Sequence, residues 1–124
     1  MAKEEAIRLW LVPLSEELQP VELPQCESVT SIGRNPTNDI VLPKAYAYAS
    51  RDHFRIRSNL ANLSGPIWLE DLSANGTYVN GRRVGKGFSK RLKCGDEISL
   101  AKPHRRGGAL HFQLAKLISR MSKL

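Results

Sequence analysis

The sequence has few of the residues from which metal-binding sites are built. Only three histidines and two cysteines occur among its 124 residues. Cys26 and Cys94 lie far apart and form no CxxC pair, so we expect free thiols rather than a disulfide framework. No His/Cys spacing suits zinc, and no acidic cluster suits magnesium or calcium. We therefore expect neither a metal ion nor a cofactor.

The sequence also lacks the motifs of common enzyme classes. It contains no GxSxG turn for a nucleophilic serine and no GxxxxGK[ST] or GxGxxG loop for a nucleotide. Ser50 and His53 are close in sequence, but a hydroxyl and an imidazole do not by themselves make a catalytic triad. We expect no enzymatic activity in this segment; a kinase domain could be attached if the chain is a fragment.

Long hydrophobic runs are absent as well. No stretch approaches the roughly 20 apolar residues that span a bilayer, and MAKEEAIRLW has no signal-peptide shape. These absences predict an intracellular protein of the nucleus or cytoplasm, with no membrane partner. The alternative is the peroxisome, because Ser122-Lys123-Leu124 is a peroxisomal address if residue 124 is the true C-terminus.

Positive charge is what the sequence has in excess. Nineteen lysines and arginines face 12 aspartates and glutamates, which gives a formal net charge of +7. That balance favours an anionic partner, which could be nucleic acid, an acidic membrane face or a phosphorylated protein. Aromatic residues make up only 6% of the chain and no RNP, KH or zinc-finger pattern occurs, so nucleic acid is the weaker alternative.

Short apolar stretches separated by turn residues run along nearly the whole chain. Many short strands in a chain of this length predict an all-β sandwich folded as one domain. Asn80-Gly81 predicts a tight hairpin between two of the strands. The helical spacing of Leu114, Leu117, Ile118 and Met121 also predicts a short C-terminal helix. We expect strands at residues 8–12, 29–32, 40–42, 53–57, 67–72, 77–79, 82–84, 98–100 and 110–114, and loops at 44–49, 58–66, 85–93 and 102–108.

Four short motifs carry groups suited to binding an anion. Gly33-Arg34 ends an expected strand, and an arginine fork matches two phosphate oxygens. Ser50-Arg51-Asp52-His53 starts sixteen residues after Arg34 and offers a hydroxyl donor and a second cation. Asn75-Gly76 and Asn80-Gly81 provide turns, and an asparagine amide can donate and accept hydrogen bonds at once. Each motif alone is common, whereas their order and spacing are specific.

This ordered set resembles the signature of the forkhead-associated (FHA) domain, over about residues 8–116. The stretches DHFRI, LEDLSANGTYVNG and RVGKG are also similar to the FHA module of checkpoint effector kinases. The resemblance implies that the chain, 1–124, is a single FHA domain, a β-sandwich of about eleven strands. It also implies binding to phosphothreonine in a partner protein or peptide, in signalling such as a DNA-damage or cell-cycle response.

The resemblance further implies a role for each matching residue. Arg34 and Ser50 would hold the phosphate, and Arg51 would support it by charge and through its backbone. Asn75 would form hydrogen bonds to the main chain of the bound peptide. Five residues match positions that are mainly architectural, which makes the histidine a packed strut rather than a base: Gly33, His53, Gly76, Asn80 and Gly81.

Two features limit or extend that assignment. Ala74 stands where related modules often carry a hydroxyl residue that touches the phosphate, so one contact is expected to be missing, with Arg51 as the candidate to compensate. The basic turn at residues 102–108 is expected to be a solvated hairpin tip, or alternatively a second patch for acidic residues. Nucleic-acid binding and phosphate-independent protein interaction stay open as other functions.

Overall fold

Eleven β-strands make up the secondary structure of residues 5–59, 65–101 and 110–120, the part of the chain that the computed structural model describes. No helix long and apolar enough to cross a membrane occurs in these ranges. The strands are β1 (Glu5–Pro13), β2 (Val21–Glu22), β3 (Ser28–Gly33), β4 (Ile40–Val41), β5 (Phe54–Ser58), β6 (Ile67–Asp71), β7 (Thr77–Val79), β8 (Arg82–Arg83), β9 (Ser89–Leu92), β10 (Glu97–Leu100) and β11 (His111–Arg120).

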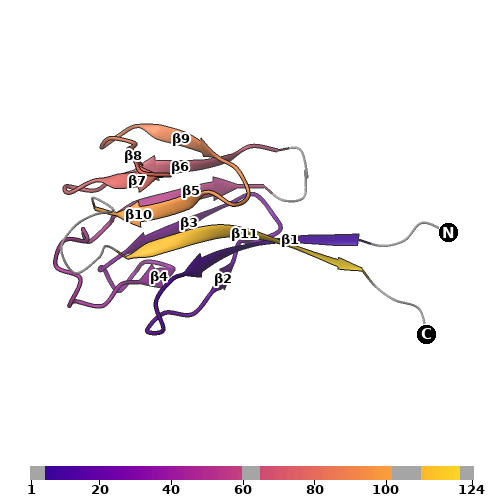
Figure 1. Ribbon diagram of the computed structural model, residues 1–124, viewed down its shortest axis with the longest axis horizontal. Helices are drawn as coiled ribbons and strands as arrows, with labels where there is room; N and C mark the ends of the chain where they lie inside the picture. Colours follow the sequence, from indigo (N-terminus) through magenta and orange to yellow (C-terminus); the bar gives the residue numbers. More distant parts are fainter. Residues whose placement is uncertain (1–4, 60–64, 102–109, 121–124) are drawn as a thin grey trace.

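The strands form two sheets that pack against each other (Figure 1). One sheet has the order β2-β1-β11-β10-β7-β8 and the other the order β4-β3-β5-β6-β9. Alternate residues of strands from both sheets are fully buried in one hydrophobic core, as expected when each sheet covers the apolar face of the other. The predicted all-β sandwich is therefore confirmed. The largest of the buried side chains include Leu11, Ile32, Phe54, Ile56, Leu69, Ile98, Phe112 and Leu114.

The predicted C-terminal helix is wrong over residues 114–120, because β11 continues as a strand to Arg120. Nine consecutive residues of β11 pair with β1, from Glu5 opposite Arg120 to Pro13 opposite Phe112. Burial alternates over residues 110–114, and Leu117 is 53% exposed rather than part of an apolar helical stripe. The long ladder with β1 therefore decides the conformation. Residues 121–124, with Met121 and the SKL tripeptide, lie outside the described residues.

The predicted loop over residues 85–93 contains a strand, β9, which pairs with β6 at the edge of its sheet. Only Leu92 is buried there, whereas the other three residues are exposed, so the segment has no apolar alternation for the sequence to reveal. The two-residue strand β2 was not predicted either, and it pairs with β1 at Trp10 and Leu11. Edge strands with at most one buried side chain, such as these two, leave little pattern in the sequence.

Two local predictions are confirmed. Asn80 and Gly81 have φ values of 51° and 82° and connect β7 to β8, as a two-residue hairpin turn requires. Cys26 and Cys94 are both free and exposed. The basic turn predicted at residues 102–108 lies outside the described residues.

Candidate anion-binding site

An open depression lies where the end of β3 meets the β4–β5 and β6–β7 loops. Its volume is about 510 Å³, and three cationic side chains and one carboxylate in its lining give a formal charge of +2. The lining residues are Arg34, Ser50, Arg51, Asp52, Leu72, Ala74 and Lys86. The fold thus brings together three residues that the sequence motifs single out, whereas Asn75 does not line the depression and directly follows Ala74 in the adjoining loop.

Arg34 is fixed at the rim by the backbone on both sides of Ser50. Its own N–H donates to the Ser50 carbonyl at 3.1 Å, and its Nε donates to the Ala49 carbonyl at 2.5 Å. These bonds leave the two terminal NH₂ groups of the guanidinium with no partner among the described residues. Arg34 is half-buried and lines the depression. An anion there could accept two parallel hydrogen bonds.

Gly33 permits this arrangement because the neighbouring backbone passes over its Cα. A Cβ at this position would lie 2.1 Å from the Arg51 carbonyl oxygen and 2.8 Å from Nδ2 of Asn38. That asparagine also donates to the Arg51 carbonyl at 2.7 Å, which holds the β4–β5 loop against the end of β3. No sequence motif marks Asn38, which lies between two expected strands.

Ser50 connects the two loops that border the depression. Its Oγ accepts a hydrogen bond from the backbone N–H of Ala74 at 2.9 Å. Because a hydroxyl both accepts and donates, its hydrogen stays available to a ligand. Ala74 has no side-chain hydroxyl, as expected, but its backbone N–H positions the hydroxyl of Ser50.

His53 is fully buried and forms hydrogen bonds to both of these loops. Its Nδ1 accepts the Ser50 N–H at 2.9 Å, so the ring proton belongs on Nε2, which donates to the Gly76 carbonyl at 3.0 Å. Burial lowers the pKa of the imidazole, and the bond to Gly76 and the nearby Asp71 carboxylate only partly oppose that effect. A neutral imidazole therefore bridges the backbones on either side of the depression.

Asp71 organises the β6–β7 loop from inside the protein, and the sequence analysis missed it. Its buried carboxylate accepts hydrogen bonds from Ser73 Oγ at 2.6 Å, Thr77 Oγ1 at 2.8 Å and the Gly85 N–H at 3.1 Å. One side chain thereby fixes both the loop that carries Asn75 and the turn after β8. The sequence LEDLSANGT offers a signal, because an aspartate two residues before a serine commonly closes such a turn.

Lys86 also lines the depression, and motif analysis missed it. It stands between Gly85 and Gly87, whose φ values of 104° and 85° make a tight turn. The Gly87 N–H donates to the Asp71 carbonyl at 2.7 Å, which anchors the turn beside the β6–β7 loop. This bond and the pairing of β9 with β6 bring the lysine to the depression, so the stretch RVGKG does not by itself reveal its place there.

Asn75 is exposed, and its amide is oriented by the neighbouring loop. Nδ2 donates to the Tyr48 carbonyl at 3.0 Å, and Oδ1 has no partner among the described residues. The amide oxygen can therefore accept a hydrogen bond from a passing peptide N–H. Asn80 is differently engaged, because its Nδ2 donates to Asp96 and its Oδ1 accepts the Glu97 N–H, both at 2.9 Å. It fixes the β7–β8 hairpin against the start of β10.

Comparison with known proteins gives consistent matches. The sequence model of the FHA domain matches residues 30–101. The chain is 36% identical over 77 residues to the ovarian-specific serine/threonine-protein kinase Lok of Drosophila melanogaster, which covers 57% of the chain and 16% of the kinase. It is 38% identical over 74 residues to the serine/threonine-protein kinase RAD53 of Saccharomyces cerevisiae, covering 60% of the chain and 8% of that kinase. The chain thus spans about a sixth or less of the length of these relatives.

The structure agrees with the sequence comparison. The N-terminal FHA domain of RAD53P from S. cerevisiae, solved in complex with a phosphothreonine peptide, superposes with a TM-score of 0.71 at 24% identity. The match covers 87% of the chain and 92% of that domain. At this level of identity the similarity establishes the fold.

Proposed function

The chain belongs to the FHA domain family, and we propose on this premise that it binds phosphothreonine in partner proteins. One observation carries the proposal. Arg34, whose terminal NH₂ groups are unengaged, and Ser50 line one depression of net positive charge, beside two loops that His53 connects. In this proposal the whole chain acts as one binding module without catalytic activity, in a signalling protein such as one of a DNA-damage or cell-cycle response.

The charge of the depression suits a phosphate group. A phosphothreonine carries about −1.5 to −2 charge and three acceptor oxygens, and the lining has a formal charge of +2. Arg34 and Ser50 would donate to the phosphate oxygens, and Arg51 and Lys86 would add charge. Hydrogen bonds to charged groups are worth about 1.5–3 kcal/mol each when shielded from water. For an open depression we take the lower end of this range for each of two bonds, or about 3 kcal/mol together. This corresponds to roughly 30- to 300-fold discrimination against the unphosphorylated peptide.

The bound peptide would be oriented by its main chain. The Oδ1 atom of Asn75 is available to an N–H of the ligand, because its Nδ2 is already held by Tyr48. Leu72 and Ala74 are the apolar residues of the lining, and Leu72, the larger of the two, offers a surface for the threonine methyl. A buried methyl contributes only about 0.8 kcal/mol, so a preference for phosphothreonine over phosphoserine needs shape exclusion as well.

An oriented phosphothreonine peptide library, followed by fluorescence titration of selected peptides, tests the proposal. Phosphorylated peptides should bind, and the same peptides should lose binding after phosphatase treatment. Arg34→Ala and Ser50→Ala should each weaken binding at least about tenfold while the unfolding midpoint stays close to wild type. Arg8→Ala is the matched control, because Arg8 is half-exposed on β1 and pairs only with Glu22. Equal binding by all four proteins would disprove the assignment.

A further inference from the structure

The positive charge of this protein is concentrated in one short segment. Residues 81–93 contain six lysines and arginines and no aspartate or glutamate. The remaining residues hold 13 cations against 12 acids, so this segment accounts for nearly the whole net charge of +7. The six residues are Arg82, Arg83, Lys86, Lys90, Arg91 and Lys93.

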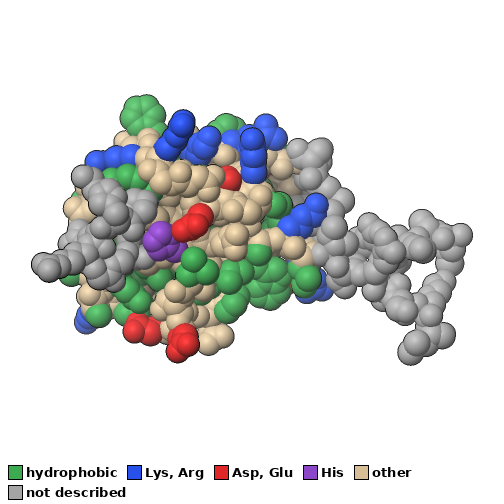
Figure 2. All heavy atoms as spheres, viewed as in Figure 1, with side chains coloured by type: hydrophobic (Ala, Val, Ile, Leu, Met, Phe, Trp, Pro, Cys, Tyr) green, Lys and Arg blue, Asp and Glu red, His purple; other side chains and the backbone are tan. Residues whose placement is uncertain are grey.

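The fold places this segment along one side of the sandwich. Strand β8 is the last strand of one sheet and β9 the last strand of the other, and the two edges lie next to each other because residues of both line one groove. All six cationic residues are exposed, and none pairs with a carboxylate of a described residue. Figure 2 shows Lys and Arg side chains gathered along the margin where Figure 1 places β8 and β9. We call this surface the basic edge.

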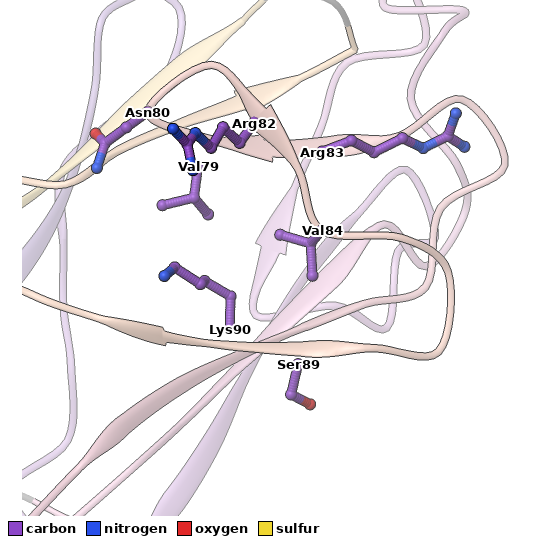
Figure 3. A pocket seen from close by; sticks show the side chains of 7 residues that line it. All are labelled: Val79, Asn80, Arg82, Arg83, Val84, Ser89 and Lys90. Atoms are coloured by element: carbon purple, nitrogen blue, oxygen red, sulfur yellow. The ribbon is translucent and has the colours of Figure 1, made fainter.

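A groove lies within the basic edge, between the β7–β8 hairpin and β9. It has a volume of about 360 Å³ and is lined by Val79, Asn80, Arg82, Arg83, Val84, Ser89 and Lys90. In Figure 3 the side chains of Val84 and Lys90 extend into the space between the hairpin and β9, whereas Arg83 extends away from it. The groove therefore offers an apolar floor and cationic walls.

The turn that connects the two strands of the groove reaches the depression of the proposed phosphate site. Lys86 lines that depression and occupies the turn that joins β8 to β9, the two strands of the groove. Gly85 and Gly87 of the turn both donate hydrogen bonds to Asp71, so its position is fixed relative to the β6–β7 loop. A chain that lay in the depression and continued along this turn would come next to Arg82 and Lys90, on the strands at either side of the turn.

Two plainer explanations account for less. Charged side chains on edge strands prevent edge-to-edge aggregation, but that role needs no single sign of charge, and six unpaired cations repel one another. Nucleic acid would also match the charge, yet single strands are usually bound on several aromatic platforms. Phe88 is the sole aromatic residue between residues 81 and 93. The link through Lys86 favours a ligand that already occupies the depression.

We infer that the basic edge binds an acidic segment that flanks the phosphothreonine in the same partner chain. This inference rests on the proposed function. Carboxylates of the flanking segment would face Lys86 first and then Arg82 and Lys90. The domain would thereby select phosphothreonine followed or preceded by aspartate and glutamate, and it would discriminate against the same phosphothreonine in a neutral sequence.

The test compares phosphothreonine peptides that differ only in their flanks. One peptide has glutamines on both sides, and two others have four glutamates on one side or the other. At low salt, one acidic peptide should bind wild type about threefold to tenfold tighter than the glutamine peptide, since each exposed ion pair adds only modest affinity. The gain should shrink toward 0.3 M salt, because exposed charges are screened.

Variants of matched charge locate the effect. Arg82→Gln with Lys90→Gln should abolish the gain and leave binding of the glutamine peptide unchanged. Arg8→Gln with Lys116→Gln changes the net charge by the same amount on β1 and β11, which lie away from β8 in the same sheet, and this variant should keep the gain. No gain in wild type, or an equal loss in both variants, would overturn the inference. Tight binding of a DNA duplex that the Arg82/Lys90 variant loses, with no gain for either acidic peptide, would overturn it in favour of nucleic acid.

The same measurements separate this inference from the proposed function. The glutamine peptide reports the phosphate site alone. If it binds only when phosphorylated, the proposed function stands whatever the acidic flanks do. If phosphorylation makes no difference, the proposed function fails first.

Discussion

Replacing His53 by alanine tests how the two loops of the depression are held. The imidazole is fully buried, and each of its nitrogens has a backbone partner, the Ser50 N–H at 2.9 Å and the Gly76 carbonyl at 3.0 Å. Its ring also packs edge-on against Phe54, with centroids 6.3 Å apart. Alanine would remove both bonds and leave a cavity between the β4–β5 and β6–β7 loops.

The cost of this change follows from those contacts. Each backbone group left without a partner costs about 1–3 kcal/mol, and the lost packing adds to it. We expect His53→Ala to lower the free energy of unfolding by about 3–5 kcal/mol, out of the roughly 5–15 kcal/mol typical of a domain. For a chain of this length that corresponds to a fall in melting temperature of about 10–20 °C.

Urea denaturation followed by tryptophan fluorescence measures the effect. The slope of the transition should stay unchanged, so that the shift in midpoint reports stability. His111→Ala is the control, because His111 pairs with an exposed carboxylate, Glu97, and should cost no more than about 1 kcal/mol. Below the transition, His53→Ala should also bind phosphothreonine peptide about tenfold more weakly. If His53→Ala proves as stable as His111→Ala, the bridging role of the imidazole is refuted.

Three further predictions concern the same region. Gly33→Ala should destabilise the fold by about 1–3 kcal/mol and weaken peptide binding, because its Cβ would displace the Arg51 backbone; Gly81→Ala, strained only in φ, should lose stability but keep binding in the same titration. Asp52→Asn removes a carboxylate from the depression and should tighten binding of a phosphorylated peptide about twofold to fivefold, with no change for the unphosphorylated one. The free energy of unfolding should fall as pH drops below about 6.5, by at most about 1.4 kcal/mol per pH unit. In this range His53 binds a proton in the unfolded chain, whereas in the folded protein its lowered pKa keeps it neutral until lower pH. The free energies of unfolding of wild type and His53→Ala, measured by urea denaturation between pH 7.5 and 5.5, should converge by that amount. A difference between the two proteins that stays constant with pH would contradict the prediction.

Much of the fold could be predicted because its strands have local patterns. The alternation in β5 and the Asn80-Gly81 turn each correspond to a physical requirement of the element itself. The end of β11 could not be predicted in this way, since Leu114, Leu117 and Ile118 fit a helix as well as a strand. Its conformation depends on nine pairs with β1, at the other end of the chain.

The candidate site divides along the same line. Arg34, Ser50 and Asn75 could be found because they belong to an ordered set of motifs. Lys86 could not, because its place at the depression depends on contacts between separate loops. Asp71 leaves a local signal in LEDLSANGT, but its hydrogen bond to Gly85 across the fold could not be predicted from that signal. A single lysine between glycines is indistinguishable in sequence from a solvated turn.

The pairing of Glu5 with Arg120 brings the two ends of the described chain together. In Figure 1 both strand ends lie at the pole of the sandwich away from the β4–β5 loop. A polypeptide joined to either strand end would be attached at the side opposite the depression, so it would leave the β4–β5 loop accessible. This arrangement suits a binding module that can be fused through either terminus to different proteins without a change in its binding surface.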